Sequence, residues 1–78
     1  MIKYLNSRQK EIVADLDIFE DPEVVANPYT KEKCTLEPIA VALYDFIKGA
    51  EMLGDKDFAE AISLFRYNWP DEYMKLLD

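Results

Sequence analysis

Carboxylates are the side chains of this sequence most able to do chemistry, and six of them lie between Glu11 and Glu23. No lysine or arginine interrupts this run. Paired carboxylates can act as general acid and nucleophile, but only in a deep cleft that raises the pKa of one of them. A chain of 78 residues seldom encloses such a cleft, so the run favours binding over catalysis.

A second acidic group lies further along the chain and lacks the ligand spacing of a calcium-binding loop. It consists of Asp55, Asp57 and Glu60. Helix capping explains these three residues better than a metal does.

The cysteine and histidine content excludes several kinds of active site. Cys34 is the one cysteine, and there is no histidine. This excludes an internal disulfide, the usual zinc sites, and dyads or triads that depend on histidine. No phosphate-binding loop or dinucleotide fingerprint is present. The sequence therefore predicts a protein that is not an enzyme and holds no cofactor or metal, with Cys34 as an ordinary thiol suited to a reducing cytoplasm.

The charge balance predicts the kind of partner. Sixteen acidic and nine basic residues give a formal net charge of −7. Such a surface repels nucleic acid phosphates and anionic membranes, so we expect a protein partner with a basic surface and no direct binding to nucleic acid or membrane. No apolar run approaches the roughly 20 residues that span a bilayer, and the start lacks the apolar core of a signal peptide. We therefore expect a cytoplasmic protein.

The element that must position these side chains is a long apolar helix predicted over Leu36–Leu53. Thr35 is placed to cap it, Pro38 falls in its first turn, and Gly54 follows its last apolar residue. Its apolar positions recur at three- and four-residue steps. They are Leu36, Ile39, Leu43, Phe46, Ile47, Ala50 and Leu53.

The opposite face of this helix is also largely apolar, because it carries Val41, Tyr44 and Met52. Two interpretations remain open. Other helices cover this face, since exposed apolar patches are uncommon on small monomers. Alternatively, these residues and Tyr67 form a surface for self-association, which would make the protein a structural module and a homodimer.

Shorter elements are expected on either side of the central helix. Asn6 and Gln9 resemble a capping box, with Ser7 as the alternative cap, for a first helix that runs to about Glu20. Pro22 starts a short helical turn over Val24 and Val25. Residues 29–35 read as a loop, with a short extended segment as the alternative.

Two more helices follow the central one. Asp57 caps the first of them, and Pro70 begins the second. Altogether the sequence predicts an all-α fold, a small bundle of four or five short helices around the central helix, in a single helical domain over residues 1–78.

Residues 43–70 resemble one helical hairpin of the tetratricopeptide type. The matching residues are Gly54, Asp55, Phe58, Ala61, Ile62, Phe65 and Pro70. The resemblance implies two antiparallel helices, but one repeat cannot form a peptide-binding groove. The C-terminal half, through ALYDFIKGAEMLG and NWPDEYMKLLD, is also similar to small uncharacterised proteins of bacteriophages and mobile elements. That resemblance implies an inhibitor of host machinery.

The first helix has an apolar stripe that we expect to be buried, formed by Ile12, Val13, Leu16 and Phe19. On a helical projection the acidic residues flank this stripe, and Ile18 lies in the middle of the outward face. Such a face can be a solvated surface that keeps the protein soluble. It can also dock on a basic groove of a nucleic-acid-binding protein, with Ile18 as an apolar anchor, and mimicry of a nucleic acid backbone is a special case. The predicted partner-binding residues are Glu11, Asp15, Asp17, Ile18, Asp21 and Glu23.

Overall fold

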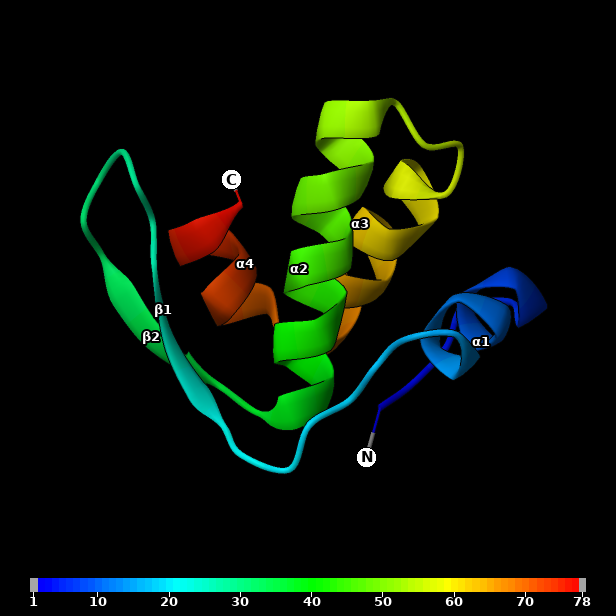
Figure 1. The fold of residues 1–78 in the computed structure, drawn as a ribbon, viewed down its shortest axis with the longest axis horizontal. Coiled ribbons are helices and arrows are strands. Elements are labelled where there is room, and N and C mark those ends of the chain that lie inside the picture. The colour runs from blue at the N-terminus through cyan, green and yellow to red at the C-terminus, as the bar shows by residue number, and fades with distance from the viewer. Residues whose placement is uncertain (1, 78) are drawn as a thin grey trace.

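The computed structural model describes residues 2–77, which form four helices and one two-stranded antiparallel sheet (Figure 1). The elements are α1 (Ser7–Ala14), β1 (Glu23–Ala26), β2 (Lys33–Leu36), α2 (Pro38–Leu53), α3 (Phe58–Asn68) and α4 (Pro70–Leu76). The fold is mostly helical, as predicted, but the prediction of a purely all-α fold is wrong because of the sheet.

Helix α2 lies at the centre of the fold, between the hairpin and α1 in the view of Figure 1. It begins two residues later than predicted, because Leu36 is the last residue of β2. Thr35 lies in β2 and therefore does not cap the helix; Glu37 occupies the cap position with an extended backbone, which the following Pro38 favours. Gly54 ends the helix in the left-handed region at φ 67°, as predicted.

The two apolar faces of α2 are not equally covered. Leu43 and Ile47 are fully buried, and Val41 and Tyr44 are buried on the opposite face, so the first interpretation is right for these two residues. Met52 is different, because 87% of its surface is exposed.

The hairpin of β1 and β2 replaces the helical turn predicted over Val24 and Val25. Its register pairs Glu23 with Leu36 and Val25 with Cys34. Valine favours strands because its branched side chain packs well on a pleated surface. Of the two interpretations of residues 29–35, the loop is right for the first part, and the extended segment is right for residues 33–35, which lie in β2 and pair with β1.

Asn27 organises the turn of the hairpin and ties it to the helices. Its Oδ1 accepts the backbone N–H groups of Tyr29 at 2.8 Å and Thr30 at 3.3 Å. Its Nδ2 donates to the carbonyl oxygen of Lys75 in α4 at 2.8 Å. Because Asn27 is buried, these bonds satisfy a side chain that would otherwise destabilise the fold.

Helix α1 ends at Ala14, six residues before the predicted end near Glu20. Aspartate is a poor helix former, Asp17 and Asp21 repel each other at a four-residue spacing, and Pro22 disfavours helix at the residue before it. The chain therefore leaves the helix, and Phe19, which was predicted in the buried stripe, is 74% exposed. The predicted Asn6 cap is confirmed, since its side chain accepts the N–H of Gln9 at 3.1 Å.

Helix α3 supplies the other half of the core against α2. Phe65 is fully buried there, and its ring contacts those of Tyr44 and Trp69 with centroids 6.5 Å and 5.3 Å away. Gln9 of α1 is also fully buried and donates through Nε2 to the carbonyl oxygen of Glu60 in α3 at 3.3 Å. The hydrogen bond of Gln9 thus fixes α1 against α3.

Candidate functional site

The predicted partner-binding residues do not share one helical face, so that part of the interpretation is wrong. Only Glu11 lies within α1, and Asp15 occupies its C-cap position. Asp17 and Asp21 lie in the irregular segment between α1 and β1, as does Ile18, and Glu23 is the first residue of β1. Whether these residues bind a partner stays a prediction.

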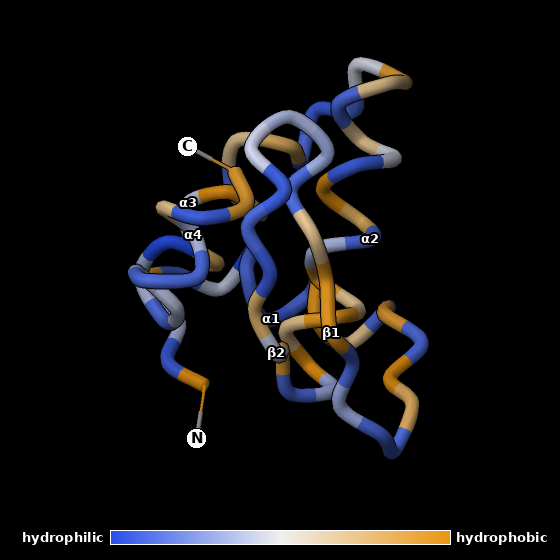
Figure 2. The backbone as a smooth tube through the Cα atoms, turned by 90° about the vertical axis from the view of Figure 1, so that its left-hand side faces the viewer, coloured by the Kyte–Doolittle hydropathy of each residue, from blue (hydrophilic) through white to orange (hydrophobic). Residues whose placement is uncertain are grey.

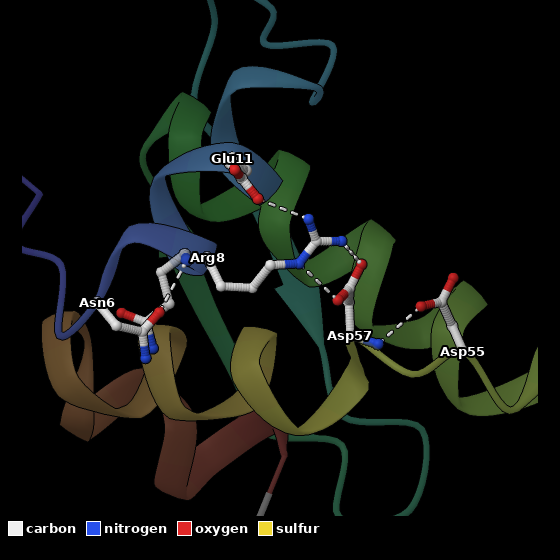
Figure 3. A network of polar contacts seen from close by, with 6 residues as sticks. Asn6, Arg8, Glu11, Asp55 and Asp57 are labelled. Atoms are coloured by element: carbon white, nitrogen blue, oxygen red, sulfur yellow. Dashed lines mark hydrogen bonds and ion pairs between the residues drawn. The ribbon is translucent and has the colours of Figure 1, made fainter.

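Glu11 belongs to an ion-pair network that links α1 to the start of α3 (Figure 3). Arg8 Nη1 donates to Glu11 Oε2 at 2.7 Å, and Arg8 Nε donates to Asp57 Oδ1 at 2.9 Å. A second bond from Nη2 to Asp57 makes this pair bidentate. Asp57 was predicted to cap α3 with its side chain, but that carboxylate makes no cap hydrogen bond and binds Arg8 instead.

The hydrogen bonds between Arg8 and Asp57 shift the pKa values of both side chains. Hydrogen bonds from the Arg8 guanidinium lower the pKa of the Asp57 carboxyl, and the same bonds raise the pKa of Arg8. Asp57 also receives support from the preceding turn, because Asp55 Oδ1 accepts the Asp57 backbone N–H at 2.8 Å. The Arg8–Asp57 pair thus holds α1 against the start of α3, while Glu11 bonds to Arg8 within α1.

The remaining predicted acids gather elsewhere, around two adjoining hollows between the 15–23 segment and α2. The smaller hollow has a volume of about 140 Å³ and the more open one about 390 Å³. We call their combined lining the acidic groove. Its carboxylates are Asp15, Asp17, Asp21, Glu23 and Asp45.

The floor of the acidic groove is apolar. Phe19 and Ala42 line both hollows, and Val41 lines the smaller one. Leu16, Pro38 and Phe46 complete the lining. A cavity of roughly 150 Å³ accommodates a benzene ring, so the smaller hollow can take one branched or aromatic side chain.

Phe19, and not Ile18, is the exposed apolar side chain that lines the acidic groove. Ile18 is 44% exposed but lines neither hollow, whereas Phe19 is 74% exposed and lines both. Asp45 was missed because it belongs to α2, far along the chain from the acidic run. Its spacing of three from Ala42 and four from Val41 places it on the same helix face as the floor, and this signal could have found it.

The carboxylates of the acidic groove form no ion pair with any of the residues that the structure describes. In residues 2–77, both ion pairs involve Arg8, so the five groove carboxylates have no cationic partner there. The same residues contain no group of three or more acidic, cysteine or histidine side chains arranged to hold a metal ion. The groove therefore presents an unbalanced negative field next to exposed apolar surface.

Cys34 lies half-buried on the inner side of the hairpin. Burial raises the pKa of its thiol, and nearby Glu72 acts in the same direction. A reactive cysteine has a lowered pKa, so Cys34 stays protonated near neutral pH and is a poor nucleophile.

Comparisons of the chain with protein-family models, with curated proteins and with solved structures found no match. The resemblances to bacteriophage proteins and to a tetratricopeptide hairpin thus stay predictions. Across residues 2–77, none of the helices has the length and apolar character needed to cross a membrane.

Proposed function

We propose that this protein is a small, non-enzymatic interaction protein whose acidic groove binds a basic segment of a protein partner. An apolar side chain of the partner enters the smaller hollow beside Phe19, and lysine or arginine side chains around it meet the carboxylates. Charge then steers association, while the buried apolar group slows dissociation.

The observation that carries this proposal is the position of Phe19. A phenylalanine that is 74% exposed contributes little to the stability of the fold. Phe19 nevertheless lies between Asp17 and Asp21 in sequence and lines both hollows with Asp45. Unneutralised carboxylates around an exposed aromatic ring complement a basic surface with an apolar residue at its centre. A solvated face that served only solubility would not need the ring.

The proposed partner is a nucleic-acid-binding protein, because such proteins carry clustered lysine and arginine side chains. Occupying that cluster would inhibit nucleic acid binding, which agrees with the resemblance to small bacteriophage proteins. We expect this chain and the nucleic acid to compete electrostatically for the basic surface of the partner, without direct contact between the acidic chain and the nucleic acid.

A second candidate function, self-association, is favoured by one observation. Met52 and Leu53 are adjacent at the end of α2 and are 87% and 85% exposed. Val41 and Tyr44 are buried and offer no surface for this purpose. A homodimer formed this way would be held by apolar contacts and would tolerate salt, whereas the acidic groove would lose affinity as salt rises.

The test begins with capture of partners from the native host and their identification by mass spectrometry. The captured protein is then titrated against its own nucleic acid with and without this chain. We expect displacement of the nucleic acid that weakens steeply with salt. Partners without a basic surface, or displacement that is insensitive to salt, would contradict the proposal.

A further inference from the structure

The outer edge of β1 is open. The sheet has only two strands, and the helices that pack on the hairpin, α2 and α4, lie against β2. Within residues 2–77, no hydrogen bond other than those of the pairing with β2 reaches the backbone of residues 24–26. β1 is also apolar at its centre, as the orange tube in Figure 2 shows, and Val24 is 66% exposed. An open apolar edge is a template for a further strand.

The register shows which backbone groups this edge presents. Asn27 N–H donates to the Glu32 carbonyl oxygen at 2.8 Å, so Asn27 lies opposite Glu32 just beyond the sheet, with its N–H on the β2 side. Hydrogen-bonded and non-hydrogen-bonded pairs alternate in an antiparallel ladder. Val25 therefore bonds towards β2, and the N–H and C=O groups of Val24 and Ala26 point outwards.

The charges along this edge differ at its two ends. Glu20, Asp21 and Glu23 lie at the start of β1, where Asp21 and Glu23 also line the acidic groove. Lys31, Glu32 and Lys33 lie at the opposite end, near the hairpin turn, and together they carry a net positive charge. A segment that runs along β1 would therefore meet negative charge at the groove end and positive charge at the turn end.

We propose that the basic partner segment continues from the acidic groove along β1 and adds to the sheet as a third strand, with its basic residues at the groove end. This rests on the proposed function, because the groove supplies the charge that selects the segment. Main-chain bonds to Val24 and Ala26 give affinity, and the groove gives specificity. A second copy of this chain fits less well, because each copy carries a net charge of −7 and two copies repel each other.

The experiment uses the whole chain and a displayed library of random peptides of about ten residues, a length that spans the strand and the groove. The best binder is synthesised, and amide hydrogen exchange of the protein is followed with and without it. We expect a peptide rich in lysine or arginine that slows exchange at Val24 and Ala26 by about tenfold or more, with a smaller effect at Val25, which is already bonded.

A matched pair of variants separates the backbone from the side chain. Val24→Pro removes an outward N–H while leaving the bonds to β2, and Val24→Thr keeps both the N–H and the branched side chain. Val24→Pro should bind the peptide about three- to tenfold more weakly, the effect of one lost hydrogen bond, and Val24→Thr should bind as the unaltered protein does.

Each remaining outcome contradicts the proposal in a distinct way. A basic peptide that perturbs the groove but leaves exchange at Val24 and Ala26 unchanged would overturn the added strand and leave the proposed function standing. A library that yields no basic binder would overturn both. Slowed exchange in the protein alone, as its concentration rises, would show a second copy to be the occupant.

Discussion

The carboxylates of Glu11 and Asp57 and those of the acidic groove are chemically alike, but only the first two meet a cation. Arg8 bonds to both, and the three residues join α1 to α3. In the groove, five carboxylates surround Phe19 and no lysine or arginine pairs with them in residues 2–77. Acidic residues therefore link elements of this fold where a cation pairs with them, and they produce a negative field at the surface where no cation does.

The aromatic residues differ in the same way, because Phe65 is fully buried whereas Phe19 is exposed. Replacing the buried one should have the largest effect. Phe65 is fully buried against Tyr44, so Phe65→Ala should destabilise the fold by about 3–5 kcal/mol, close to the whole stability of a small domain. Urea unfolding followed by circular dichroism measures this. A cooperative transition near that of the unaltered protein would show that the core is not centred on α2 and α3.

Reversal of charge in the groove should have the next largest effect, on binding alone. Asp17 and Asp45 line both hollows and are exposed, so changing both to lysine should abolish binding of the basic partner by slowing encounter and adding repulsion. The fold should change by less than about 0.5 kcal/mol. Association rates at two salt concentrations measure the effect.

A matched control makes the same change of charge elsewhere. Glu51 and Asp71 are exposed and line neither hollow, and Glu51 adjoins the apolar Met52. Reversing these two to lysine should leave most of the binding intact. Equal losses from both double variants would mean that net charge, and not the groove, determines association.

Phe19→Ala should separate the contribution of the apolar floor to binding from that of the carboxylates around it. Because this side chain is 74% exposed, its loss should leave the unfolding transition almost unchanged. Binding should weaken by about ten- to a hundredfold, mainly through faster dissociation. Ile18→Ala is the comparison, since Ile18 lines neither hollow, and its effect should be small. The reverse order of the two variants would restore Ile18 as the anchor.

The smallest expected effect concerns the network at Arg8. The pKa of Asp57 is lowered in the folded protein, so this carboxylate adds stability above its ordinary pKa of 3.8, and the gain is lost as the pH falls through the folded-state pKa. Asp57→Asn should therefore lower the melting temperature at neutral pH and have little effect in acid. Asp17→Asn, which breaks no ion pair in residues 2–77, is the control and should leave the melting temperature at neutral pH almost unchanged.

Sequence patterns predicted the elements whose signals are local. Pro38 and Gly54 mark the ends of α2, and Asn6 caps α1, because a helix start or stop depends on neighbouring residues. The sheet was missed because Val24 and Val25 are too short an apolar run to distinguish strand from helix, and their pairing with β2 is not local.

The site was predicted only in part, because sequence patterns reveal residues that are close along the chain and not those that folding brings together. Asp17 and Asp21 lie close together in sequence and were found, but Asp45 reaches the groove from α2 only after the chain has folded. Arg8 likewise could not be matched to Asp57 from the sequence, since 49 residues separate them.

The most direct test of the acidic groove is nuclear magnetic resonance of the labelled protein during titration with its basic partner. The account predicts that the largest changes in backbone chemical shift fall on residues 15–23 and on the first two turns of α2, including Asp45. Changes concentrated at Met52 and Leu53, with the groove unaffected, would contradict it and place the interaction at the other end of α2.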